Sequence, residues 1–418
     1  MVDLATLPNR TGIQKRTIRV LIVSQALGSA GISIAVTEGG PIVQDLTGSS
    51  RFAGSASAAV TFGGALAALL ISGIMKRHGR RAGLLRGYLV ALLGSVIVVY
   101  GANARILWLF LFGALLFGVG QGTNLLTRYA AADLALPNER GQAISLLLFG
   151  STFGAVLAQF LVPLCERLAE DAGLWKFCGP FVFAGLMLVI SFGNCFFRLK
   201  PDPLVLAGGV FDDGKRGIQL PNIGRAIGVI RASRGATLGL VSMALSQAAM
   251  VGIMTMTPVH MRDHARTFDL RGPVIALHVC GMYLFAPIVG KLVDRRGRLP
   301  MITTGAVLLI TATSVSAAAG HNPTLLFLGL FLLGFGWSFG MIGGTALVNE
   351  SVPADDRVTV QGSADLIMSV CGAIAGFGSG FIKEALGYHR LSIFGIGLAF
   401  ALALAAVRHQ RRPSLALG

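Results

Sequence analysis

Charged residues are scarce in this chain of 418 residues: they make up 13% of it, whereas an ordinary soluble domain carries about 25%. Acidic residues are the rarest, with 19 Asp and Glu against 35 Lys and Arg. A composition with 54% hydrophobic residues and so few charges excludes an ordinary soluble protein. It predicts a chain that is solvated by lipid.

Cysteine and the common cofactor motifs are also nearly absent. The five cysteines lie in or beside apolar stretches without metal-ligand spacing, so we expect small packing residues and no metal site. A glycine run at 334–344 lacks the Lys and Ser or Thr of a nucleotide loop, and no cofactor is expected. The loops lack the clustered carboxylates or histidines of a membrane-embedded enzyme, so enzyme activity is not expected.

Long apolar stretches are what the chain does contain. A helix must be about 20 residues long to cross the hydrocarbon core, and lipid offers no partner to backbone amides outside helices and closed barrels. The stretches lack the alternation of a membrane barrel. The sequence therefore predicts an all-α membrane protein with 12 transmembrane helices, at 18–41, 53–75, 83–102, 106–127, 142–165, 178–197, 236–258, 273–293, 300–320, 324–347, 359–381 and 391–408.

The basic residues fall unevenly on the two sides of these spans. Alternate loops, counted together with both termini, hold 26 Lys and Arg on one side and 9 on the other. By the positive-inside rule both termini are cytoplasmic in a multi-pass protein of the cell (inner) membrane. The net charge of +16 therefore sets orientation and does not predict a nucleic-acid partner.

The first half of the chain is repeated in the second. Landmark residues of the first half recur in the second at an offset of 216 to 218 residues. The pairs are Gly79 and Gly297, Gly118 and Gly334, Gly120 and Gly336, Pro41 and Pro258, and Arg140 and Arg357. Duplicated six-helix halves are typical of transporters whose site lies near the bilayer midplane. We expect two pseudo-symmetric six-helix bundles at 1–198 and 236–418, joined by a cytoplasmic loop at 199–235.

The connection between the halves contains a helical pattern near its end. Ile223, Ile227 and Ile230 recur at helical spacing with Arg225 and Arg231 between them. This pattern fits a short helix over 222–233 that lies on a surface. The alternative is a plain tether.

A loop motif follows the eighth span. Residues 290–298 read GKLVDRRGR, with Asp294, Arg295, Gly297 and Arg298 at fixed spacing. This motif resembles the loop signature of the major facilitator superfamily of secondary transporters. The resemblance implies a twelve-helix fold and a cytoplasmic latch between the halves in the outward-facing state. It would bring Asp294 to the start of the fifth span, near Arg140.

The first-half copy of the motif departs from this pattern. It keeps Gly79 and a basic cluster with Arg77, but Lys76 stands where the resemblance expects Asp. The start of the eleventh span carries Asp355 and Asp356, so the latch would pair these carboxylates with Lys76 and Arg77. The alternative is that the cluster only anchors the topology.

Three acidic residues or histidines fall within predicted spans, where a charge costs about 2.5 to 3.5 kcal/mol. Asp365 lies roughly 12 Å into the eleventh span and is the first candidate for proton coupling, or else a structural carboxylate bound to Gln361. His278 is a proton relay or a helix-to-helix hydrogen bonder. Glu38 is a coupling residue or a gate or cap at the interface.

Polar residues in other spans predict where substrate binds. Gln121, Asn124 and Arg128 form one stripe on the fourth span, at i, i+3 and i+7. The resemblance implies that spans one, four, seven and ten line the substrate cavity. Further candidates are Gln25, Gln247, Gln361 and Trp337, of which Trp337 either stacks a flat ligand or fills a packing gap.

These residues predict a proton-coupled secondary transporter, acting as a monomer on a small-molecule substrate. Drug efflux by proton antiport is disfavoured because the superfamily's exporter motifs are damaged: Gly118 replaces an Arg, and Gly154 precedes Ala where a Gly-Pro pair is expected. Uptake of a nutrient or vitamin, riboflavin-like in character, is favoured. A methionine-rich seventh span keeps efflux open as the alternative.

Overall fold

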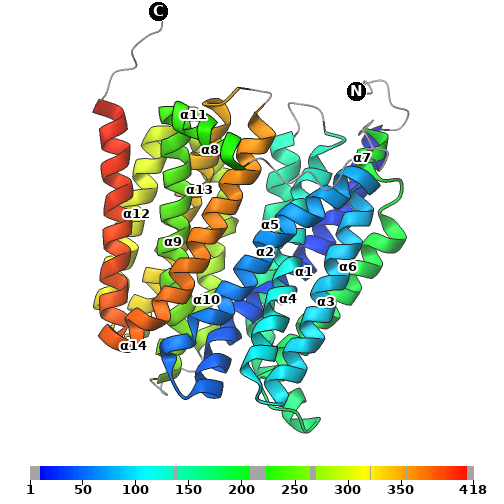
Figure 1. Cartoon of the computed structure of the whole chain (residues 1–418), viewed down its shortest axis with the longest axis vertical. Helices are drawn as coiled ribbons and strands as arrows, with labels where there is room; N and C mark the ends of the chain where they lie inside the picture. Colours follow the sequence, from blue (N-terminus) through cyan, green and yellow to red (C-terminus); the bar gives the residue numbers. More distant parts are fainter. Residues whose placement is uncertain are drawn as a thin grey trace, which may run out of the picture. The chain divides into compact units, whose positions relative to one another are not determined.

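The computed structural model describes residues 10–135, 140–207, 223–263, 270–320, 322–353 and 356–411, and every regular element within these ranges is helical. The chain forms two compact units, Met1–Leu220 and Pro221–Gly418, which Figure 1 colours from blue to green and from green to red. The division falls inside the predicted connection at 199–235. The prediction of an all-helical chain is confirmed.

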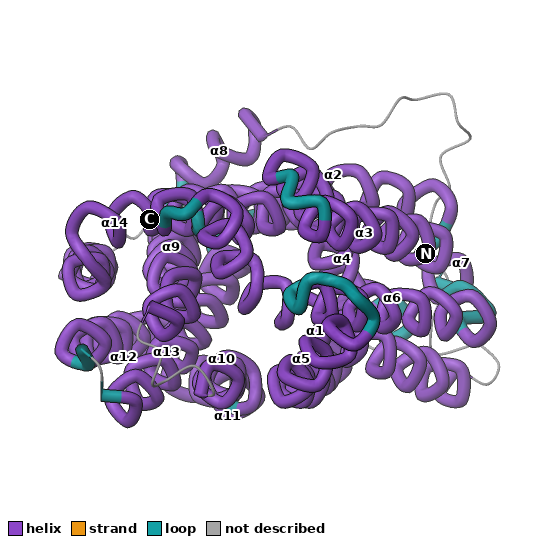
Figure 2. Tube along the Cα trace, turned by 90° about the horizontal axis from the view of Figure 1, so that it is seen from below, coloured by secondary structure: helices purple, strands orange, loops and turns teal. Residues whose placement is uncertain are grey.

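Unit 1 is built from six long helices. They are α1 (Arg10–Thr47), α2 (Gly54–His78), α3 (Arg80–Asn103), α4 (Leu107–Ala132), α5 (Arg140–Asp171) and α6 (Cys178–Arg198). Two short helices accompany them in the described residues, η2 (Ser50–Phe52) before α2 and α7 (Pro203–Leu206) after α6. Figure 2 views the long helices end-on.

Unit 2 repeats this order with one helix broken and two fused. It contains α8 (Ile223–Ala232), α9 (Arg234–Asp263), α10 (Arg271–Val279), the π-helix η4 (Cys280–Leu284), α11 (Ala286–Arg296), α12 (Arg298–Ala318), α13 (Pro323–Glu350) and α14 (Arg357–Arg411). Together α10, η4 and α11 form the eighth span. Two spans lie in α14, because Gly387 has φ 80° and ψ 168° and interrupts it.

The described residues contain eleven helical stretches that are long and apolar enough to cross a membrane. Since the last of them is two helices meeting at Gly387, twelve spans result, as the sequence predicts. The surface of the helices is apolar: Trp108, Phe197 and Ile374 are 78%, 72% and 68% exposed. Such side chains suit a lipid environment, where apolar exposure carries no penalty.

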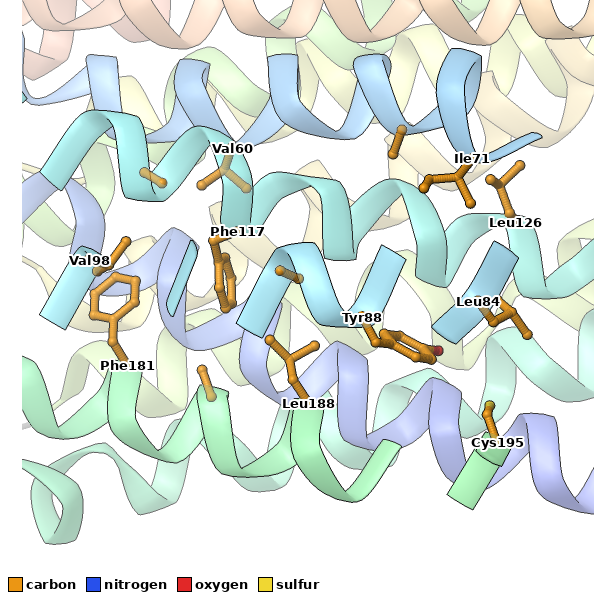
Figure 3. Close-up of a cluster of buried hydrophobic side chains, with 14 of the residues drawn as sticks. Val60, Ile71, Leu84, Tyr88, Val98, Phe117, Leu126, Phe181, Leu188 and Cys195 are labelled. Carbon is orange, nitrogen blue, oxygen red and sulfur yellow. The ribbon is translucent and has the colours of Figure 1, made fainter. Parts of the chain in front are cut away.

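Aromatic side chains fill the centre of unit 1 (Figure 3). Phe117 of α4 and Phe181 of α6 are buried, with ring centroids 6.1 Å apart at 75°, an edge-to-face pair. Tyr88 of α3 and Leu188 of α6 are also fully or almost fully buried. The predicted spans thus pack through a continuous apolar core.

Glycines bring the helix backbones together. A methyl group at Gly118 would lie 2.1 Å from the Val60 carbonyl oxygen, so α2 and α4 cross with no room for a side chain. Close approach through small residues is the usual way that helices pack in lipid, where water does not drive them together. At Gly118 the exporter motif's arginine would therefore not fit.

The glycine contacts recur in unit 2 with the predicted offset. A methyl group at Gly334 of α13 would lie 2.4 Å from the His278 carbonyl oxygen, just as one at Gly118 would meet the Val60 carbonyl oxygen in unit 1. Equivalent helix pairs are also in contact, such as α3 with α4 and α12 with α13. The internal repeat that the sequence predicts is thus present in the packing of each unit.

The loop glycines of the two motif copies have nearly the same backbone conformation. Gly79 has φ 89° and ψ 166°, and Gly297 has φ 90° and ψ 162°. Each amide N–H caps the preceding helix, bonding the Met75 carbonyl at 3.0 Å and the Val293 carbonyl at 3.1 Å. Only glycine adopts this positive φ without strain, which explains why it stands at both turns.

The helix predicted at 222–233 is confirmed as α8, and one of its faces is covered. Ala226 and Ile230 are buried against Val348, Val352 and Val360 of unit 2. Arg225 pairs with Asp356 at 2.8 Å. The segment that leads into unit 2 is therefore held on that unit by apolar and ionic contacts.

Candidate functional site

Three polar or aromatic side chains from different helices meet in unit 2. The indole Nε1 of Trp337, on α13, donates a 2.7 Å hydrogen bond to Oε1 of Gln247, on α9. The ring of Tyr283, in η4, lies edge-to-face on Trp337, with centroids 5.8 Å apart at 82°. Trp337 is 5% exposed, whereas Gln247 and Tyr283 are half-buried. We call these residues the Gln247–Trp337–Tyr283 cluster.

The hydrogen bond to Trp337 fixes which way the Gln247 amide faces. An indole N–H only donates, so the carbonyl oxygen of Gln247 must face Trp337 and the NH₂ group must point away from it. Within the described part of the chain, that bond is the one hydrogen bond made by the Gln247 side chain. Two amide N–H donors therefore stay available.

Tyr283 was not predicted as a site residue, and a proline explains its position. Pro287 has no N–H to bond the carbonyl of Tyr283 four residues earlier, so the α-helix cannot continue through this point. The chain adopts the π-helix η4 instead, and the amide of Phe285 bonds the Tyr283 carbonyl. Such π-segments within membrane helices are frequent at functional sites. Pro287 was the available sequence signal.

His278 lies two residues before the same π-helix. It is fully buried, and its Nδ1 lies 2.7 Å from the Leu330 carbonyl oxygen of α13. A carbonyl only accepts, so Nδ1 carries the proton and Nε2 of the neutral ring is an acceptor. Nε2 has no hydrogen-bond partner among the described residues. The observed contact is the helix-to-helix bond that was one of the two predictions for this residue.

The two other titratable candidates lie on different helices. Glu38 of α1 is fully buried, and Asp365 of α14 is half-buried. Gln361, considered as a partner of Asp365, donates to Asn349 Oδ1 at 2.5 Å. The amide of Gln361 therefore ties α14 to α13.

Two polar candidates of unit 1, Gln25 and Asn124, belong to one hydrogen-bond network. Gln25 Nε2 donates to Ser151 Oγ at 2.8 Å, and its Oε1 accepts from Thr127 at 2.6 Å. The side chain of Asn124 donates to the backbone carbonyl oxygen of Gln25 at 3.2 Å and accepts from the Tyr88 hydroxyl at 3.4 Å. Gln25 and Asn124 are 6% and 3% exposed. Their polar atoms therefore join α1, α3, α4 and α5.

The predicted stripe on α4 is divided by this packing. Asn124 points into the bundle, whereas Gln121 and Arg128 are half-buried. Oε1 of Gln121 is buried and has no hydrogen-bond partner among the described residues. The amide oxygen of Gln121 is thus not used in packing within the described residues.

The two motif loops carry matching ion pairs. Arg80 binds Asp133 through two bonds, from Nε at 2.8 Å and from Nη2 at 3.0 Å. In unit 2, Arg298 pairs with Glu350 and lies 3.7 Å from Asp294. Asp133 and Glu350 were not predicted, although their separation of 217 residues follows the repeat. Each pair fixes the end of one span to the start of another.

The remaining latch residues are described in part. Arg77 is half-buried, Arg295 is exposed, and the carboxylate of Asp356 pairs with Arg225 of α8. Asp355 lies outside the described residues, as do the side chains of Lys76, Arg140 and Arg357. The expected pairing of Lys76 and Arg77 with Asp355 and Asp356, and that of Asp294 with the start of α5, stays a prediction.

Comparison with known proteins identifies a family. The sequence profile described as the Major Facilitator Superfamily matches residues 20–375 and 240–416. An uncharacterized MFS-type transporter of Bacillus subtilis (strain 168), YddS, is 37% identical over 96% of this chain and 92% of its own. The riboflavin transporter RfnT of Brucella anthropi is 28% identical over 90% and 92%.

Solved structures share the fold at low sequence identity. The crystal structure of the nucleoside transporter NupG superposes with a TM-score of 0.72 and 15% identity, over 96% of this chain and all of that one. At such identity the likeness concerns the arrangement of helices and carries no information on substrate.

Proposed function

The chain belongs to the major facilitator superfamily of transporters, and from this premise we propose that it carries a small organic solute into the cell by proton-coupled alternating access. The observation that carries the proposal is the similarity to a riboflavin transporter over nine tenths of both chains. A repeat of two six-helix units supports alternating access, because such repeats are the usual basis of that mechanism.

Proton coupling is proposed through Asp365, with His278 and Glu38 as further candidates. Asp365 is half-buried in the middle of a span, where an ionised carboxylate is costly and a proton lowers that cost. His278 keeps an acceptor nitrogen without a partner in the described chain, and this is the atom that would receive a proton if the cycle exposed the ring to water. These features support an exchange of protons during the transport cycle.

The proposed location is the cell (inner) membrane, with both termini cytoplasmic and the chain acting as a monomer. The excess of Lys and Arg on one side of the spans, 26 against 9, supports this orientation. The ion pairs Arg80–Asp133 and Arg298–Glu350 then lie at the cytoplasmic ends of the spans, where polar groups are solvated.

Efflux is the second candidate, and the packing gives it less support. The methionines of α9 were considered as a soft binding surface, but Met243, Met250 and Met256 are at most 4% exposed, and only Met254 of the four is half-buried. At Gly154, a methyl group would lie 1.8 Å from the Ala26 carbonyl oxygen, so α1 and α5 are in backbone contact there. A resistance profile of cells that express the chain separates export from uptake.

Transport in proteoliposomes tests the proposal. Vesicles containing the purified full chain are given a pH gradient, acid outside, and offered labelled riboflavin, other vitamins, sugars, amino acids and drugs. We expect one class of solute to accumulate above its outside concentration and to leak out when a protonophore is added. Uptake no faster than in protein-free vesicles for every compound would contradict the proposed function.

A further inference from the structure

We propose that the Gln247–Trp337–Tyr283 cluster recognises a flat conjugated ring through a carbonyl group on its edge. This inference rests on the proposed transport function and names its substrate class. Gln247 and Tyr283 would contact the solute, and Trp337 would act as a positioning residue behind them. The argument depends on which polar atoms of the cluster are already used.

The available groups of the cluster can all donate. With its carbonyl oxygen held by Trp337, Gln247 presents two N–H groups away from the indole. The hydroxyl of Tyr283, which can donate or accept, makes no hydrogen bond within the described residues and belongs to a half-buried side chain. A solute that presents an acceptor can satisfy both residues, whereas one that presents only donors at the same place leaves the N–H groups of Gln247 unpaired.

The donors are neutral, which favours a neutral acceptor. An ionised carboxylate taken out of water needs a cationic partner to offset its desolvation, and an amide or phenol supplies only a hydrogen bond. A neutral ring carbonyl loses much less hydration than a carboxylate does, and it gains the same hydrogen bonds from the amide and the phenol. The cluster therefore favours imides, lactams and ring ketones over acids.

The preference for a flat solute follows from the aromatic side chains of the cluster. Trp337 is 5% exposed and presents almost no face to a ligand, so we assign it the positioning role. Tyr283 projects from η4 with one edge on Trp337, which leaves its own half-buried ring as the surface on which another ring can stack. The break in the eighth span sets the position of that ring.

The side-chain amides of unit 1 are used differently. The amide oxygen and nitrogen of Gln25 are both bonded within the bundle, as is the amide of Asn124. Gln247 is bonded through its oxygen alone. The amides of Gln25 and Asn124 therefore serve packing, whereas Gln247 in unit 2 has free donors.

Calorimetric binding to the detergent-purified full chain tests the inference separately from transport. The probes are lumichrome, a flat tricycle with two ring carbonyls, 2,3-diaminonaphthalene, a flat ring with donors on its edge, and ribitol, which has no ring. We expect wild-type protein to bind lumichrome and neither of the others measurably. If lumichrome does not bind while another solute is transported, the inference fails and the proposed function stands.

Three variants locate the binding groups. Gln247→Glu keeps the shape but replaces donors with acceptors, so we expect lumichrome affinity to fall at least about tenfold. Tyr283→Phe should lower it about threefold to tenfold. The matched controls are Gln410→Glu and Tyr100→Phe, since both residues are exposed, and they should bind as wild type does. Equal affinity in Gln247→Glu and its control would overturn the inference.

The role of Trp337 has a distinct readout. In Trp337→Phe the Gln247 amide is free to turn and to offer its oxygen, so selectivity changes as well as affinity. We expect this variant to gain measurable binding of 2,3-diaminonaphthalene, which Trp108→Phe, at an exposed position, should not. A uniform loss of affinity without a change of selectivity would contradict the positioning role. If Gln247→Glu is not monodisperse, the inference is decided by two other measurements. These are the lumichrome affinity of Tyr283→Phe and the selectivity of Trp337→Phe.

Discussion

Replacing Gly334 by alanine should force two helices of unit 2 apart. A methyl group there would lie 2.4 Å from the His278 carbonyl oxygen, and a carbon–oxygen contact needs about 3.3 Å. The backbones of α10 and α13 must therefore separate by about 1 Å. Overpacking of this kind costs about 1–3 kcal/mol.

The same movement should break a hydrogen bond one turn away. His278 Nδ1 lies 2.7 Å from the Leu330 carbonyl oxygen, and about 1 Å of separation stretches it beyond bonding range. Its loss adds about 0.5–1.5 kcal/mol, while alanine's helix propensity returns about 1 kcal/mol. The net destabilisation of roughly 1–3 kcal/mol should lower the unfolding temperature by about 3 °C or more.

Thermal unfolding of the purified chain measures this effect through reaction of the buried cysteines with a thiol-reactive dye. The matched control is Gly378→Ala on α14, where a methyl group meets nothing within 4 Å. This control should gain stability from helix propensity alone. The reasoning is refuted if Gly334→Ala unfolds at the temperature of the control or above it.

Three further predictions concern other parts of the chain. Arg80→Asp should destabilise unit 1 by about 2 kcal/mol, because it leaves the mostly buried Asp133 next to a like charge, and adding Asp133→Arg should restore part of the loss in the same thermal assay. Gly387→Ala should lower the unfolding temperature, since φ is 80° there, whereas Gly397→Ala, in open space, should not. Asp365→Asn should still exchange solute but no longer concentrate it in proteoliposomes under a pH gradient; concentration at the wild-type level would remove Asp365 as the coupling group.

The sequence predicted the fold well because lipid imposes simple rules. A span must be apolar and about 20 residues long, and its backbone must be helical. Twelve spans could therefore be located from the positions of the apolar stretches alone. The repeat was visible because glycines at helix crossings cannot change without a clash. Gly118 and Gly334 show this directly, since both touch the backbone of a neighbouring helix.

The candidate site was less predictable because it depends on which way each helix faces. The spacing of Gln121, Asn124 and Arg128 predicts one stripe, but the Tyr88 hydroxyl and the Gln25 carbonyl draw Asn124 into the bundle. No local pattern encodes contacts between residues that are 36 or 99 positions apart in the chain. The spacing of the three residues could therefore be read from the sequence, whereas the direction in which each side chain points is set by packing.

Tyr283 and the motif ion pairs were missed for other reasons. Pro287 signals a break in the eighth span, but a proline alone does not distinguish a kinked α-helix from a π-helix that re-aims Tyr283. Asp133 and Glu350 sit at helix ends, where charges are expected in any case. Of their partners, Arg298 was assigned to the motif without the acidic residue that it binds, and Arg80 was not singled out.

The central claim, that this chain transports a small organic solute by alternating access, is tested most directly by counterflow. Proteoliposomes are loaded with a high concentration of unlabelled riboflavin and diluted into a trace of labelled riboflavin without any ion gradient. A carrier that alternates between two faces should accumulate label transiently inside, above its equilibrium level, because each return trip brings labelled solute in. Label that only rises slowly to equilibrium, as in protein-free vesicles, for riboflavin and for every other solute of the panel, would contradict the account.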